Sequence, residues 1–189
     1  MGPLLKMDKK TEPLLKPKKI MKTNFDNIDE LLAFIISFEG LRLKAYKCPA
    51  GVWTIGAGRT KGVKEGMTIT REKAIEFLKE DVNDVMNQIL SVLEGDGSIL
   101  TTNQFFALTS FVYNVGIGNF KKSTLLKLIN SGHKNDLELI HKQFSRWVYA
   151  NKKVLPGLVK RREAEFKLYS TPESSESMTE GNIDDFNLK

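Results

Sequence analysis

The stretch FEGLRLKAYKCPAGVWTIGAGRT (Phe38–Thr60) marks a change in the pattern of apolar residues, and this change decides which fold we expect. Before it, apolar residues recur at three- and four-residue steps from residue 24, which predicts a helix that ends at Gly40. Within it, glycines interrupt the β-prone sequence Val-Trp-Thr-Ile. We therefore predict two or three short antiparallel strands over residues 41–60. The stretch also holds the only cysteine of the chain, Cys48.

Helical periodicity dominates the rest of the chain. The apolar pattern predicts helices over residues 70–93, 105–115, 123–131, 136–147 and 158–169. Thr101 and Gln104 have the spacing of a capping box before the second of these, and Gly116 and Gly118 are expected to break it. The fold class we expect is α+β, with a small N-terminal antiparallel sheet and a mainly helical C-terminal lobe.

The distribution of charge divides the 189 residues into three parts. Residues 1–22 hold seven lysines against two acids, whereas residues 170–189 hold five acids against one lysine. We expect a basic flexible leader (1–22), one folded domain (23–169) and an acidic flexible tail (170–189). The formal net charge of +6 favours an anionic partner, which charge alone does not identify.

Several classes of protein are disfavoured by the composition. No segment approaches the roughly 20 apolar residues of a membrane span, and lysines and prolines interrupt the region where a signal peptide would need its apolar core. One cysteine excludes an internal disulfide, and with two histidines it is too little for a structural zinc site. We expect no metal, no cofactor, no stable membrane insertion, a monomer, and no nucleic-acid partner, because no basic helix with base-reading residues is seen.

Glu39 is the first candidate catalytic residue. It follows an apolar run at the C-terminal end of the predicted helix, where the macrodipole is negative. Both features favour a protonated carboxylic acid, which general acid catalysis requires. The alternative is a helix-end glutamate that points into water.

Thr54 is the second candidate. If residues 52–58 are extended, Thr54 shares one face of the strand with Gly56 and Gly58, which leave room for a ligand or a water molecule. The alternative is a threonine that is present only because it suits a strand.

The spacing of Glu39, Cys48 and Thr54 within EGLRLKAYKC…GVWTIGAG resembles the phage-type lysozymes, glycoside hydrolase family 24. The resemblance implies that Glu39 is the general acid, that Cys48 stands at the second catalytic position, which is Asp or, in some members, Cys, and that Thr54 binds the attacking water. It also implies a lysozyme-like fold with a substrate cleft between the two lobes. The sequences of residues 101–130 and 144–169 extend the resemblance over about residues 25–169.

The chain departs from the family pattern at two positions. The family usually shows Gly-Tyr-Gly-His-Thr where this chain has Ala57 and Arg59 within Gly-Ala-Gly-Arg-Thr. The resemblance assigns the histidine an ion pair with an acidic partner, and we expect Arg59 to take over that pair. Ala57 removes an aromatic surface.

The substrate that the resemblance implies is peptidoglycan, cleaved between N-acetylmuramic acid and N-acetylglucosamine, with Tyr113 and Asn114 as sugar-contact residues. The basic charge fits a polyanionic wall, to which Arg161 and Arg162 are candidate contributors, although a charged helix face is usually a solvated one. Phe105, Phe111, Trp147 and Phe166 are assigned to the core. The expected location is synthesis in the cytoplasm of a bacterial host and action at the cell wall or periplasm, by an export route that the sequence does not reveal.

Cys48 leaves the outcome of the reaction open. A free thiol has a pKa of about 8.5, so only a few per cent is thiolate at neutral pH, and it is a weaker base than aspartate. Cys48 can position the water beside Thr54, act covalently if a nearby cation lowers its pKa, or be structural. Hydrolysis is the first expectation; a lytic transglycosylase that gives anhydro ends, or a catalytically weak wall-binding domain, are the alternatives.

Overall fold

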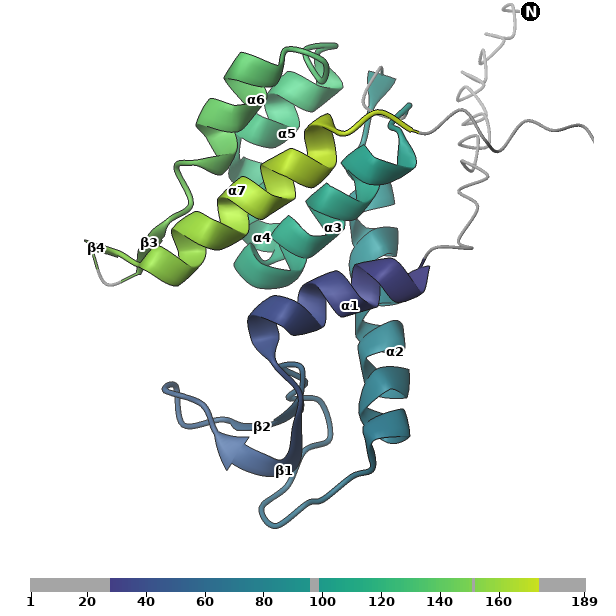
Figure 1. Ribbon diagram of the computed structural model, residues 1–189, viewed down its shortest axis with the longest axis vertical. Helices are drawn as coiled ribbons and strands as arrows, with labels where there is room; N and C mark the ends of the chain where they lie inside the picture. The colour runs from purple at the N-terminus through teal and green to yellow at the C-terminus, as the bar shows by residue number, and fades with distance from the viewer. Residues whose placement is uncertain (1–27, 96–98, 151, 174–189) are drawn as a thin grey trace, which may run out of the picture.

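The computed structural model describes residues 28–95, 99–150 and 152–173, and the fold within these ranges is mainly helical with a small two-stranded antiparallel sheet near its N-terminus (Figure 1). This confirms the predicted α+β class. The predicted leader (1–22) and residues 174–189 of the predicted tail lie outside the described residues. The elements are α1 (Ile28–Glu39), β1 (Arg42–Lys47), β2 (Trp53–Gly56), α2 (Arg71–Leu90), α3 (Thr102–Val115), α4 (Ile117–Lys122), α5 (Thr124–Asn130), α6 (Leu137–Phe144), β3 (Tyr149–Ala150), β4 (Lys153–Val154) and α7 (Pro156–Ser170).

The sheet formed by β1 and β2 follows α1 directly and lies at the opposite end of the molecule from α5 and α6 (Figure 1). Tyr46 pairs with Thr54, and Lys47 pairs with Trp53. The two side chains of each pair project from the same face of the sheet. The prediction that residues 52–58 are extended is wrong beyond Gly56. Gly56 has φ +66°, a left-handed conformation that ends the strand, and a tight turn follows it.

The predicted helices are all present, but several of their ends differ. Thr70 caps α2, whose last residue is Leu90 and not Leu93. Gly116 ends α3 as predicted, whereas Gly118 lies inside α4, so the expected break there is wrong. Helix α6 ends at Phe144, whereas the prediction ran to residue 147. Helix α7 begins at Pro156, two residues before the predicted start at residue 158. Beyond α2 and α6 the apolar residues Leu93 and Trp147 continue to pack against the core, so periodicity alone runs past the helix end. The start of α7 differs for another reason, since Pro156 stands in its first turn, where proline is well tolerated.

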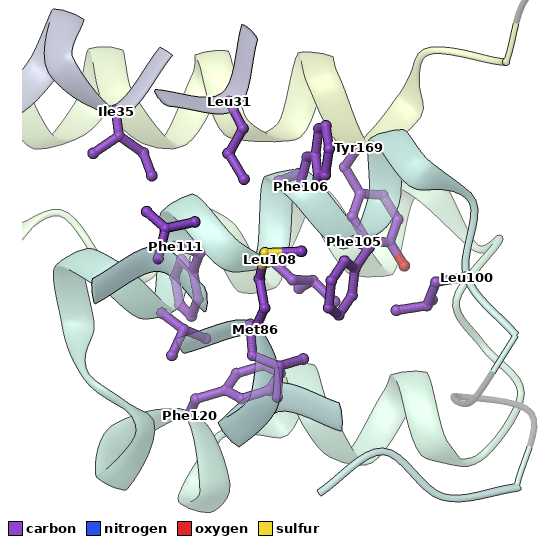
Figure 2. Close-up of a cluster of buried hydrophobic side chains, with 14 of the residues drawn as sticks. Leu31, Ile35, Met86, Leu100, Phe105, Phe106, Leu108, Phe111, Phe120 and Tyr169 are labelled. Carbon is purple, nitrogen blue, oxygen red and sulfur yellow. The ribbon is translucent and has the colours of Figure 1, made fainter. Parts of the chain in front are cut away.

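A hydrophobic core surrounds α3, which is buried along most of its length (Figure 2). Phe105 and Phe111 are fully buried, as predicted. Phe111 makes edge-to-face contacts with Phe120, Phe144 and Trp147, a geometry that aromatic rings favour. Trp147 and Phe166 pack against this core but are only partly buried. Because the core encloses α3, this helix is a fixed frame for the residues at its C-terminal end.

The sequence analysis missed the hairpin of β3 and β4, in which Tyr149 pairs with Val154 and Ala150 with Lys153. Little in the sequence indicated this hairpin, because Ala150 and Lys153 are poor strand formers and no glycine stands between the two pairs. In the structure Lys152 has φ +63° in the turn. None of the helices described here is long and apolar enough to span a membrane.

The capping box at α3 gives a first prediction. The Thr101 hydroxyl accepts from the Gln104 backbone N–H, and the Gln104 side chain accepts from the Thr101 N–H at 3.1 Å. We expect Thr101→Ala to lower the free energy of unfolding by about 1 kcal/mol, measured by urea denaturation. Thr124→Ala, at the exposed first position of α5, is the control and should change it by less than about 0.5 kcal/mol. Equal losses in the two variants would contradict this account.

Candidate active site

Glu39 is the last residue of α1, and the chain turns away from it into β1 at Gly40, which has φ +72°. Its side chain is 26% exposed, so the carboxylate is neither free in water nor fully enclosed. Its Oε1 atom lies 2.5 Å from Nη1 of Arg161 on α7. Glu39 is therefore not the free helix-end glutamate of the alternative reading, because a helix from the far end of the chain holds it.

The guanidinium of Arg161 is fixed on three sides. Besides Glu39, it donates from Nε to Glu165 Oε1 at 3.0 Å and from Nη2 to the backbone oxygen of Ser110 at 3.1 Å. Its side chain is only 4% exposed. A planar group bonded along three edges has little freedom to rotate, so Arg161 presents its charge to Glu39 from a preorganised position.

Glu165 and Arg162 complete this network behind Arg161. Glu165 is fully buried, accepts from Ser110 Oγ at 2.8 Å, and has Arg162 Nε 2.9 Å from its Oε2 atom. Burial raises the pKa of Glu165, while the two arginines act against that effect. The sequence analysis named Arg161 and Arg162 as candidate contributors to binding the wall, with a solvated helix face as the alternative. Both expectations are wrong, because Arg161, Arg162 and Glu165 face α3 and bury their charges by pairing them.

A pocket of about 350 Å³ opens beside Glu39. Its lining comes from α1, the turn after β2, α2 and α3, and consists of Glu39, Ala57, Gly58, Arg59, Thr60, Lys61, Asp81, Val85, Tyr113 and Asn114. Three of the predicted site residues, Glu39, Tyr113 and Asn114, are thus brought together from positions far apart in the sequence. Cys48 and Thr54 are not among the residues that line it.

The polar atoms of Tyr113 and Asn114 make contacts within the protein. The Tyr113 hydroxyl donates to the backbone oxygen of Ala57 at 2.9 Å, and Asn114 Oδ1 accepts from Arg162 Nη2 at 2.9 Å. Burial, followed by the nearby charges of Asp81 and Glu39, raises the pKa of Tyr113, so its hydroxyl keeps its proton. These contacts do not test the expected sugar contacts, but they show how the two side chains are held.

Arg59 lies in the turn after β2 and makes the ion pair that the sequence analysis expected of it. Its Nη1 atom is 2.9 Å from both Glu80 Oε2 and Asp81 Oδ1 on α2, and its guanidinium stacks over the Phe77 ring, 4.2 Å from the centroid. Burial raises the pKa of Asp81, an effect that Arg59 opposes. Arg59 therefore ties the turn after β2 to α2.

Cys48 follows the last residue of β1 and begins the turn between the strands, and Thr54 lies on β2. The backbone N–H groups of Val52 and Ala50 hold the pKa of the Cys48 thiol below its ordinary value, and the Thr54 hydroxyl adds to this effect. In the structure that hydroxyl donates to the Val52 backbone oxygen at 3.0 Å. The two predicted residues thus interact with each other, and the cause of the lowered pKa is backbone donors and not the cations Lys47 and Arg42 suggested by the sequence.

Among the described residues, no three His, Cys, Asp or Glu side chains lie close enough together to hold a metal ion.

The sequence analysis also missed the charge network of α7 that contacts Glu39. A signal was available, because Arg161 and Glu165 are four residues apart and Arg162 and Glu165 three, the spacings at which helical side chains meet. Their contact with Glu39 had no signal, since it joins residues 122 positions apart.

Comparison with known proteins gives a consistent result. A family model described as Phage lysozyme matches residues 36–165. The endolysin of Acyrthosiphon pisum secondary endosymbiont phage 1 is 41% identical over 145 residues, covering 74% of this chain and 94% of that protein. The endolysin of Bacillus phage B103 is 42% identical over 143 residues, and the match covers 74% of this chain but 52% of that protein. This chain therefore spans about half of that relative.

A solved structure agrees with the sequence matches. The muramidase domain of SpmX from Asticaccaulis excentricus superposes with a TM-score of 0.68 at 34% identity, covering 76% of this chain and 96% of that one. The resemblance inferred from the motif is thus confirmed in sequence and in fold.

The Arg59 ion pairs give a second prediction. We expect Arg59→Met to lower the free energy of unfolding by roughly 2 kcal/mol at pH 7, because it leaves the partly buried Asp81 carboxylate without its charged donor. The loss should shrink at pH 4, because Asp81, whose pKa burial already raises, takes up a proton and no longer needs a cation.

Lys73→Met is the control, because Lys73 also pairs with an acid on α2, Glu76, and lies over the Phe77 ring, but it is exposed. We expect a change below about 0.5 kcal/mol for that variant, as for most surface pairs. Urea unfolding at both pH values measures the difference, and a pH-independent loss in Arg59→Met would contradict the role given to Asp81.

The Cys48 environment gives a third prediction. The rate of alkylation by iodoacetamide depends on the thiolate, so its midpoint along pH reports the thiol pKa. In the folded protein we expect a midpoint below that of the same cysteine in urea, because the lowered pKa makes more thiolate at a given pH. Thr54→Val should move the midpoint upward, because it removes the hydroxyl that contributes to the lowered pKa of the thiol. A folded midpoint at or above the unfolded value would show that the backbone donors do not act on the sulfur.

Proposed function

Because this chain belongs to the phage lysozyme family and is a lysozyme-type hydrolase of peptidoglycan, we propose that it cleaves the β-1,4 bond between N-acetylmuramic acid and N-acetylglucosamine, with Glu39 as the general acid. The observation that carries the proposal is the position of Glu39. Its carboxylate lines the pocket, is partly shielded from water and is held by the fixed cation Arg161. Asp81, another carboxylate of the lining, is also paired with a cation, Arg59, but it lies on α2, outside the motif that carries the resemblance.

In the proposed reaction Glu39 donates its proton to the glycosidic oxygen as the bond to the leaving sugar breaks. The carboxylate that remains is negative and lies against the Arg161 guanidinium, 2.5 Å away in the structure. An ion pair that strengthens as the negative charge develops stabilises the transition state more than the ground state. Arg161 is therefore a positioning and electrostatic residue in this proposal, and Glu39 is the residue that transfers the proton.

Thr54 and Cys48 position the attacking water molecule in this proposal. The Thr54 hydroxyl donates its proton to the Val52 backbone oxygen, so its lone pairs remain available to accept a hydrogen bond from a water molecule. A Cys48 thiol with a lowered pKa is a second acceptor for the same water when it is ionised. Water attacks the anomeric carbon from the face opposite Glu39 and passes a proton to the Cys48 thiolate, which gives hydrolysis with inversion provided that no covalent intermediate forms.

Two alternatives remain from the sequence. If Cys48 fails to activate water, a hydroxyl of the sugar attacks instead and gives anhydro ends, as in a lytic transglycosylase. A catalytically weak wall-binding domain is the other, and the ion pair that fixes Glu39 argues against it, because binding alone does not need a positioned acid. The site of action that we propose is the bacterial cell wall, which attracts a chain of formal net charge +6.

The test is digestion of purified peptidoglycan by the wild type and by Glu39→Gln, with mass spectrometry of the released fragments. We expect the variant to lose at least about 100-fold in rate, since the amide cannot donate the required proton. Glu163→Gln is the matched control: it makes the same change at an exposed glutamate of α7 and should keep wild-type activity.

Each product has its own meaning. Hydrated reducing ends, lost in Glu39→Gln, support the proposed muramidase. Anhydro ends would assign the transglycosylase alternative, and a Glu39→Gln variant as active as wild type would remove Glu39 from the role of acid. A wild type that binds the wall but releases no fragments would support the alternative of a catalytically weak wall-binding domain.

A further inference from the structure

A single side-chain hydrogen bond joins α3 to the turn that follows β2. The donor is the Tyr113 hydroxyl and the acceptor is the backbone oxygen of Ala57, 2.9 Å away and 56 positions earlier in the chain. Both residues line the pocket that contains Glu39. The bond therefore connects the helical lobe to the turn after β2 at the pocket itself.

The turn has a geometry that needs such a contact. The backbones of Ile55 and Arg59 pair in both directions, at 2.9 and 3.0 Å, so the three residues between them form a closed loop. Gly56 and Gly58, with φ +66° and +109°, flank Ala57 in conformations that few other residues adopt. A peptide between two glycines reorients at low energetic cost, so the loop does not by itself fix where the Ala57 carbonyl points.

Tyr113 supplies the hydrogen bond that orients the Ala57 carbonyl. Within the described residues, its hydroxyl is the hydrogen-bond donor recorded for the Ala57 oxygen. Ala57 is 3% exposed, so water is largely excluded from an oxygen that costs free energy when unpaired. Burial raises the pKa of Tyr113, and the hydroxyl remains a donor over the whole working range of pH.

The ion pairs of Arg59 hold the same turn at its C-terminal end. Its ion pairs reach Asp81 and Glu80 on α2, whereas Tyr113 reaches the turn from α3. Two contacts from two helices are enough to fix the orientation of a short segment. The segment 57–61, which forms the pocket wall contributed by the sheet lobe, thus takes its position from the helical lobe.

We propose that Tyr113 is a positioning residue, whose hydroxyl fixes the segment 57–61 through the Ala57 carbonyl and so sets the distance between this wall and Glu39. This rests on the proposed role of Glu39 and differs from the direct sugar contact that the sequence analysis assigned to Tyr113. A wall that holds its place keeps the bound sugar chain aligned with the acid, and misalignment of about 1 Å is enough to reduce the rate severely.

The test compares Tyr113→Phe with Tyr169→Phe. Tyr169 is a close match, because its hydroxyl also donates to a backbone oxygen, that of Lys134, at 2.9 Å, and burial also raises its pKa. It does not line the pocket. Both variants remove one oxygen atom and one such hydrogen bond, so a general loss of stability affects both alike.

We expect Tyr113→Phe to lower kcat on solubilised peptidoglycan about 10-fold with little change in KM, whereas Tyr169→Phe keeps both constants. The two variants should have similar melting temperatures. Amide hydrogen exchange of the free protein is the second readout: the Arg59 N–H, which bonds to Ile55, should exchange faster in Tyr113→Phe and at the wild-type rate in Tyr169→Phe.

Three results would overturn the proposal: equal kcat in the two variants, a raised KM with unchanged exchange, which indicates a direct sugar contact, or a loss of kcat without faster exchange. Glu39→Gln is measured in the same assay. If it retains activity, the proposed acid is wrong, whereas the exchange data still report on the turn, so the two failures are distinguishable.

Discussion

The ion pair between Glu39 and Arg161 is the interaction on which the site depends. It joins the end of α1 to α7, and it is held by the contacts of Arg161 with Glu165 and Ser110. A charge network buried between helices is costly in desolvation, and such a network rarely adds stability over apolar packing. Its value here is positional, because it fixes one carboxylate at the side of a pocket.

The same principle applies on the other side of the pocket. The sheet is small and its turn contains two glycines in left-handed conformations, so it has little rigidity of its own. Side chains from α2 and α3, which pack around the main core, hold it in place. The helical lobe thus holds the segment 57–61, which forms the pocket wall on the sheet side, whereas Cys48 and Thr54 are not among the residues that line the pocket.

Cys48 shows how backbone chemistry modifies a thiol. A free thiol is mostly protonated at neutral pH. The N–H groups of Val52 and Ala50 favour the thiolate, and Thr54 lies close enough to contribute. The tight turn between β1 and β2 therefore does more than reverse the chain, because it provides the donors that act on the sulfur.

The amino-acid sequence by itself determined the order and type of the helices, the position of the sheet, the capping box at Thr101 and the motif that holds Glu39, Cys48 and Thr54. These follow from local periodicity, caps and spacing, which act over a few residues. Only the tertiary structure decided that the charges of α7 are buried, that Arg161 holds Glu39, and that Tyr113 bonds to Ala57. The physical reason is that such contacts join residues 56 and 122 positions apart, and local pattern carries no record of which distant faces meet.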